Sequence, residues 1–149
     1  MSVSFSNQLT PNNYPTNARA VIDNNFVQSV ALPAASATAN TNSIDLQQGT
    51  PFPTTEIINV QILTGASASG TANSKNVNAV LQTSADNSTW ANSNVIAAAV
   101  LATDNSGVLA AGKYEFKLPP NNARYIRAQF LTEANGGTPS ANGTLQLTF

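Results

Sequence analysis

Hydrophobic and polar residues alternate in short segments along most of this chain, and a period of two is typical of half-buried β-strands. One stretch, VIAAAVL at residues 95–101, could also form a two-turn helix, but its Val/Ile content and short length favour a strand. No long segment follows the 3.6-residue helical period, so a parallel α/β sheet is not expected. The pattern predicts strands at residues 26–32, 44–46, 58–62, 77–83, 95–101, 113–118, 125–130 and 145–149. We therefore predict an all-β protein, an antiparallel β-sandwich of jelly-roll or immunoglobulin-like type.

The chain of 149 residues suits a single domain preceded by a different kind of segment. Residues 1–25 are polar and proline-containing, yet they carry Phe5, Leu9 and Tyr14. Isolated apolar residues in such a segment indicate an extended N-terminal arm that orders against a partner, although a loosely attached terminus fits the same pattern. We predict an arm at residues 1–25 and one β-sandwich at residues 26–149.

The composition leaves little room for catalysis. The chain has no histidine and no cysteine, and only 9% of its residues are charged. Serine–histidine and cysteine–histidine nucleophile pairs are therefore excluded, and a zinc site nearly so. Two carboxylates could suffice for a glycosidase, but nothing in the sequence brings any two of its seven together. We expect no enzymatic activity, no cofactor and no metal.

The charge balance also limits the partners. A net charge of −1 argues against nucleic acid and against electrostatic attraction to a membrane surface. No apolar run reaches the length of a membrane span, and the N-terminus lacks the features of a signal peptide, so we expect synthesis in a cytoplasm. A partner should be held by shape, apolar burial and hydrogen bonds.

Four residues in or near the predicted strands at 113–118 and 125–130 invite two interpretations. Arg124, Tyr125, Arg127 and Lys113 could form a small positive patch. More often such residues are the outward half of alternating strands, and Glu115 is available to neutralise them.

Trp90, the only tryptophan, follows a turn-forming Asp86-Asn-Ser segment. It could stack on a sugar ring, as tryptophans do in carbohydrate-binding modules. The favoured interpretation is that Trp90 anchors the turn against the core.

Several ordered segments resemble a known family. They are SIDLQQGTPFP (43–53) leading into EIINVQILTG, then LQTSADNSTW (81–90), LPPNNARYIRAQF (118–130) and TPSANGTLQLTF (138–149). Together they resemble the jelly-roll capsid cement, or head decoration, proteins of tailed bacteriophages. The similarity covers residues 43–149, and residues 1–42 have no counterpart in it.

The resemblance implies a jelly roll that binds the outer surface of an assembled phage head and clamps neighbouring major capsid protein subunits. It implies a virion location and a homo-oligomer, dimer or trimer. The candidate capsid-contact residues are Phe5, Leu9, Tyr14, Arg124 and Arg127. The alternative is a carbohydrate-binding jelly-roll module on a virion or fibre.

Overall fold

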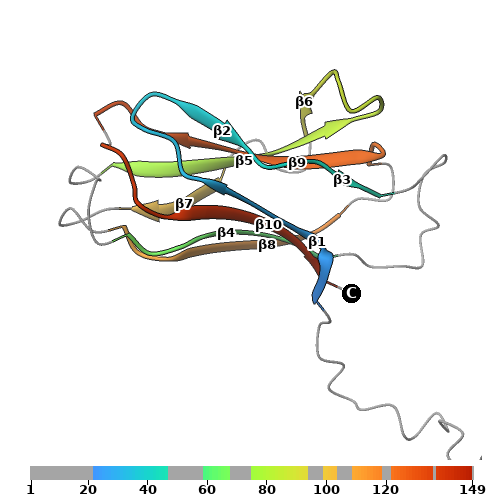
Figure 1. The fold of residues 1–149 in the computed structure, drawn as a ribbon, viewed down its shortest axis with the longest axis horizontal. Coiled ribbons are helices and arrows are strands. Elements are labelled where there is room, and N and C mark those ends of the chain that lie inside the picture. The colour runs from blue at the N-terminus through green and yellow to red at the C-terminus, as the bar shows by residue number, and fades with distance from the viewer. Residues whose placement is uncertain are drawn as a thin grey trace, which may run out of the picture.

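Ten β-strands make up the regular structure of the described residues (Figure 1). The computed structural model describes residues 22–46, 59–67, 75–93, 99–103, 109–118, 122–135 and 137–148. The strands are β1 (Ile22–Ala31), β2 (Thr38–Asn40), β3 (Ile44–Asp45), β4 (Asn59–Thr64), β5 (Asn76–Ser84), β6 (Ala91–Asn92), β7 (Ala99–Thr103), β8 (Gly112–Lys117), β9 (Tyr125–Thr132) and β10 (Asn142–Thr148). The described residues contain no helix, and hence none that is long and apolar enough to cross a membrane.

The strands form two sheets that lie face to face (Figure 1). One has the order β1-β10-β4-β8; the other has β2-β9-β5-β6, with β3 also pairing β9 and β7 also pairing β5. All pairings between these strands are antiparallel. β2 and β3 both pair with β9, and β6 and β7 both pair with β5, so each couple can be counted as one strand position. Numbered along the chain, the resulting eight positions lie in the order 1-8-3-6 in one sheet and 2-7-4-5 in the other. This is the strand order of a jelly roll, so the predicted fold is confirmed and the immunoglobulin-like alternative is excluded.

The core lies between the sheets and is built from the apolar half of each alternating strand. Val60 and Ile62 of β4 and Leu145 and Leu147 of β10 face inward from one sheet. The opposite sheet contributes the inward residues of β5 and β9, and all of these side chains are fully buried: Val77, Ala79, Leu81, Ile126, Ala128 and Phe130. Alternation with polar residues places the other half of each strand on the outer faces.

Most predicted strands are confirmed, with shifted ends. β1 begins at Ile22, four residues before the predicted domain start. β7 covers the second half of the ambiguous VIAAAVL stretch as a strand, while residues 94–98 lie outside the described part. Two short strands, β2 and β6, have no alternating apolar residues and were not predicted. β10 lies between β1 and β4, so the C-terminal segment is tied into the sheet as predicted.

Candidate interaction surface

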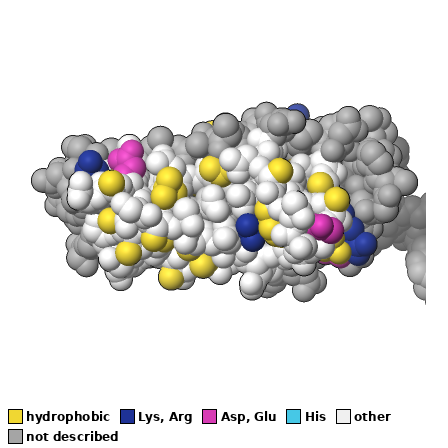
Figure 2. All heavy atoms as spheres, turned by 90° about the horizontal axis from the view of Figure 1, so that it is seen from above, with side chains coloured by type: hydrophobic (Ala, Val, Ile, Leu, Met, Phe, Trp, Pro, Cys, Tyr) yellow, Lys and Arg dark blue, Asp and Glu magenta, His cyan; other side chains and the backbone are white. Residues whose placement is uncertain are grey.

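The outer face of the six-stranded sheet carries the outward residues of its central strand, β9. Tyr125, Arg127, Gln129 and Leu131 point away from the core because they alternate with buried residues. Leu131 is 38% exposed, which is high for a leucine in a central strand. We call this surface the β9 face. Figure 2 shows it from above: charged side chains on it are few, and cationic and acidic side chains lie close together near both ends of the face.

Arg127 and Trp90 are the most distinctive pair on the β9 face. The guanidinium carbon of Arg127 lies 4.2 Å from the centroid of the Trp90 ring, a cation–π contact. Nε of Arg127 donates a hydrogen bond to Oε1 of Gln82 at 2.8 Å. Nε2 of Gln82 donates in turn to Oδ1 of Asn92 at 3.2 Å. These four residues come from β9, β5, β6 and the turn before β6, and we call them the tryptophan–arginine site.

A tight turn positions Trp90 on this surface. Oδ1 of Asp86 accepts hydrogen bonds from the backbone N–H groups of Ser88 and Thr89 at 2.9 and 2.8 Å. Asn87 adopts a positive φ of 58°, which asparagine tolerates better than most residues. The hydrogen bonds from Thr89, Ser88 and Ser84 hold the pKa of Asp86 well below its ordinary value. A rigid turn of this kind fixes where the next residue, Trp90, points.

The prediction that Trp90 anchors the turn against the core is wrong. Trp90 is half-buried, and among the described residues it belongs neither to the buried core nor to the side chains packed against it. It instead stacks on Arg127 outside the sheet. The sequence interpretation failed because tryptophans are mostly packed inward, whereas here a cation on the neighbouring strand covers the ring.

Arg124 and Tyr125 lie at one end of the β9 face. Arg124 donates two hydrogen bonds to Asp45 of β3, from Nε and Nη2, each at 2.8 Å. This forked ion pair raises the pKa of the Arg124 guanidinium. The same guanidinium lies 5.1 Å from the centroid of the Tyr125 ring. Arg124 is therefore neutralised within the chain, unlike Arg127.

The positive patch, the less favoured of the two interpretations, does not form. Lys113 lies on β8, in the four-stranded sheet, and Arg124 and Arg127 lie at the other sheet. Glu115 pairs with Lys113 at 2.7 Å and not with either arginine. The outward positions of β8 and β9 were predicted correctly, but the two strands belong to different layers of the sandwich.

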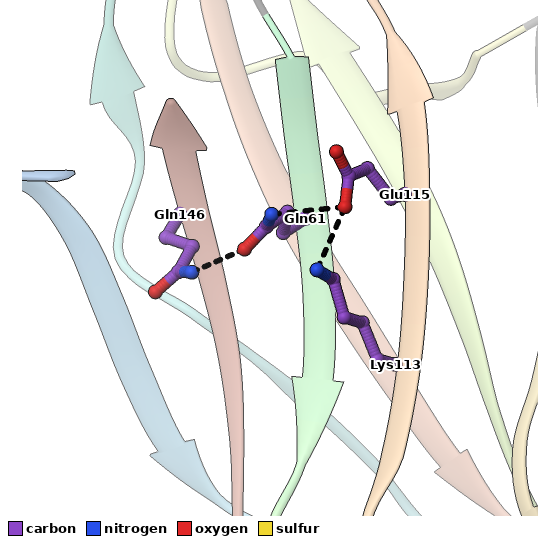
Figure 3. Close-up of polar contacts among 4 residues, drawn as sticks. All are labelled: Gln61, Lys113, Glu115 and Gln146. Carbon is purple, nitrogen blue, oxygen red and sulfur yellow. Dashed lines mark hydrogen bonds and ion pairs between the residues drawn. The ribbon is translucent and has the colours of Figure 1, made fainter. Parts of the chain in front are cut away.

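The opposite outer face holds a second polar arrangement (Figure 3). Gln146 of β10 donates through Nε2 to Oε1 of Gln61 on β4. Gln61 donates to Oε2 of Glu115 on β8 at 3.0 Å, and Lys113 pairs with that same oxygen. The Lys113 contact is the main cause that lowers the pKa of Glu115. We call this chain of four residues the amide ladder; it ties three neighbouring strands together across their outer side.

Each described carboxylate with a described side chain has a structural partner. Asp45 binds Arg124, Asp86 holds its turn, and Glu115 binds Lys113. Glu133 accepts hydrogen bonds from the backbone and side-chain nitrogens of Asn76 at 3.0 and 3.2 Å, which lowers its pKa. Within the described part of the chain no three acidic residues come together to hold a metal ion. These carboxylates thus stabilise local structure.

The candidate contact residues of the arm, Phe5, Leu9 and Tyr14, lie outside the described residues. Arg124 and Arg127, the other two candidates, both lie at the β9 face. The sequence interpretation missed Gln82 and Asn92, which complete the tryptophan–arginine site. The alternation of polar residues along the strand indicates that Gln82 faces outward. Its hydrogen-bond partners depend on how distant strands pair, and no local sequence pattern predicts that pairing.

The described part of the chain is thus an antiparallel jelly roll whose outer faces carry few charges. The family model of Bbp16 matches residues 26–145, and the chain belongs to this phage-associated family. The match supports the phage-associated part of the resemblance, and the narrower likeness to head decoration proteins stays a prediction.

Three solved structures align with most of this chain at low sequence identity. The PBSX exported protein XepA aligns with 18% identity and a TM-score of 0.47, covering 80% of this chain and 34% of XepA. The VP2 subviral particle of infectious bursal disease virus aligns with 16% identity and a TM-score of 0.45, covering 87% and 30%. A family 16 carbohydrate-binding module has 8% identity and a TM-score of 0.33, covering 78% and 71%.

The chain spans about a third of the length of the first two proteins. No curated protein matches it. The jelly-roll assignment rests on the strand order of the chain itself.

Proposed function

We propose that this chain is a structural protein of a phage virion that binds the outer surface of the assembled head and clamps neighbouring major capsid protein subunits. Membership of a phage-associated family over residues 26–145 is the observation that carries the proposal. The neutral, hydrogen-bonded outer faces support it, because such surfaces bind by fit and need no chemistry.

The clamp acts through mass action. A protein that binds the assembled shell but not free subunits stabilises the shell in proportion to its occupancy. A homo-oligomer, dimer or trimer, would touch several subunits at once, and each contact could then be modest. The arm at residues 1–21, which includes Phe5, Leu9 and Tyr14, would add contacts beyond those of the sandwich.

Co-sedimentation tests this proposal. Purified full-length protein is mixed with expanded phage heads that lack it, and in parallel with unassembled major capsid protein. We expect saturable, stoichiometric binding to heads and little binding to free subunits. A variant lacking residues 2–21, which keeps β1 intact, should bind heads more weakly while its own melting temperature stays nearly unchanged. Absence of binding by the full-length chain would refute the proposal.

A sugar-binding module remains the second candidate, because Trp90 lies on an outer face and not in the core. A glycan array with the wild-type protein and a Trp90→Ala variant separates the two. Glycan binding that disappears in the variant, together with no binding to heads, would establish the second function.

A further inference from the structure

Arg127 carries a charge that nothing nearby neutralises. Among the described residues no carboxylate lies within ion-pair distance of it, whereas Arg124 has Asp45 and Lys113 has Glu115. Partial burial lowers the pKa of Arg127, so its charge is less well solvated than that of a free side chain. A partly desolvated, unpaired cation favours the arrival of an anion.

The free polar groups around Arg127 are mostly donors. Its Nε is used by Gln82, which leaves the terminal nitrogens Nη1 and Nη2 without a hydrogen-bond partner in the described part of the chain. The side-chain nitrogen Nδ2 of Asn92 and the indole N–H of Trp90 also have no hydrogen-bond partner among the described residues. The two side-chain acceptors of the site each already accept one hydrogen bond, Oε1 of Gln82 from Arg127 and Oδ1 of Asn92 from Gln82, so each has one lone pair left.

The free donors and acceptors of the site favour some classes of ligand over others. A neutral sugar offers hydroxyl groups that need both donors and acceptors, and it stacks on an open aromatic ring. Here one side of the Trp90 ring is covered by the guanidinium at 4.2 Å, and most of the free hydrogen-bonding capacity of the site belongs to donors. A carboxylate accepts hydrogen bonds only, and the planar guanidinium fork matches its two oxygens.

The surroundings of the site favour a protein as the source of the carboxylate. Along β9 the outward residues continue through Gln129, whose Nε2 donates to Oδ1 of Asn40 at 3.0 Å, to the 38% exposed Leu131. Arg127 and Leu131 are four residues apart, which is about 13 Å along a strand. A charged anchor, an aromatic ring and an exposed apolar side chain on one rigid face are typical of protein interfaces.

We infer that the tryptophan–arginine site is a contact through which this chain binds the head, and that it receives an Asp or Glu side chain of the major capsid protein beside Arg127 and Trp90. The inference rests on the proposed function. It places the β9 face toward the shell, with Leu131 covered by an apolar patch of the same partner. The charged edge strand β8, with Lys113 and Glu115, belongs to the other sheet and lies away from this contact.

Head binding by matched variants tests the assignment. Arg127→Gln removes the charge and keeps a side chain that can donate, and Arg127→Lys keeps the charge without the fork. Lys117→Gln is the control, because that exposed lysine lies on β8 in the opposite sheet, away from the β9 face. We expect Arg127→Gln to weaken head binding about tenfold or more, Arg127→Lys to weaken it less, and Lys117→Gln to leave it close to wild type. Melting temperatures of all variants are measured to verify folding.

The outcomes are distinguishable. If the wild type fails to bind heads, the proposed function and this inference both fail. If the wild type binds and folded Arg127→Gln binds equally well, or if Lys117→Gln loses as much affinity, the site assignment alone is overturned.

Fluorescence of Trp90, the only tryptophan, provides a direct test of a sugar at the site. The protein is titrated with polygalacturonate and with neutral dextran, and no saturable change is expected from either. A saturable change with polygalacturonate that Arg127→Gln abolishes, together with head binding unaffected by that substitution, would reassign the site to an acidic polysaccharide.

Discussion

Gly143 of β10 lies directly against the ring of Phe130 of β9, across the interior of the sandwich. A Cβ atom at Gly143 would lie 2.4 to 2.6 Å from three carbons of that ring. Within its own sheet Phe130 pairs with Ala39 on one side and Ala79 on the other. The largest buried side chain thus occupies a space bordered by three small residues, which fixes how the two sheets face each other.

The first prediction concerns this contact. Gly143→Ala should destabilise the fold by about 2–3 kcal/mol, because the ring cannot move without displacing a close-packed core. The melting temperature should fall by roughly 5–10 °C for a chain of this length. Gly65→Ala is the matched control, since its added Cβ meets nothing nearer than 3.7 Å. Equal melting temperatures for the two variants would contradict the packing described.

The amide ladder leads to a second prediction. Gln61 is only 8% exposed although it faces outward, and it bonds both Gln146 and Glu115. Gln61→Leu should cost about 1–2 kcal/mol of unfolding free energy, because it leaves the half-buried Gln146 amide without its partner and Glu115 with Lys113 alone. Gln129→Leu, which removes an exposed amide pair with Asn40, should change it by less than about 0.5 kcal/mol. Urea denaturation followed by Trp90 fluorescence measures both, and a larger loss in Gln129→Leu would refute the ladder's role.

A third prediction addresses the stacking of Trp90 on Arg127. A double-mutant cycle with Trp90→Leu and Arg127→Gln should give a coupling free energy of about 0.5–1 kcal/mol, typical of a cation–π pair near the surface. Unfolding is followed by far-UV circular dichroism, because Trp90 itself is replaced. Strictly additive effects would show that the two side chains do not interact in solution.

Acid stability provides a fourth prediction. The folded protein holds the pKa of Asp86 below its ordinary value of 3.8, so the stability due to its charge is present above that pH. This stability is lost as the pH falls through the lower, folded-state pKa. Calorimetry should therefore show a melting temperature that declines below about pH 4. Asp86→Asn, which keeps the acceptor oxygen but not the charge, should decline less, and parallel profiles for the two proteins would contradict the turn's role.

The sequence predicted what depends on local alternation and missed what depends on pairing between distant segments. Ile126, Ala128 and Phe130 were correctly placed inward, because a period of two leaves only one choice of face. β2 and β6 were missed because Thr38–Asn40 and Ala91–Asn92 carry no apolar alternation and are held by β9 and β5.

The interaction surface was the harder part to predict for the same reason. Arg127 was recognised as an outward candidate, yet its neighbours Trp90 and Gln82 reach it only through the register of β9 on β5. Lys113 was grouped with it because their strands are close in sequence, although they lie in different sheets. Local sequence patterns determine on which face of a strand a residue lies, whereas the strand order determines which strands contribute to the same outer surface.

The central claim is that this chain stabilises an assembled head by binding its surface. Thermal melting of heads that lack the protein, titrated with the purified chain at low salt and at about 1 M salt, tests it most directly. We predict that the melting temperature of the heads rises to a plateau at a fixed stoichiometry, and that the rise persists at high salt because few charges are involved. An unchanged melting temperature of the heads at saturating protein would contradict the account.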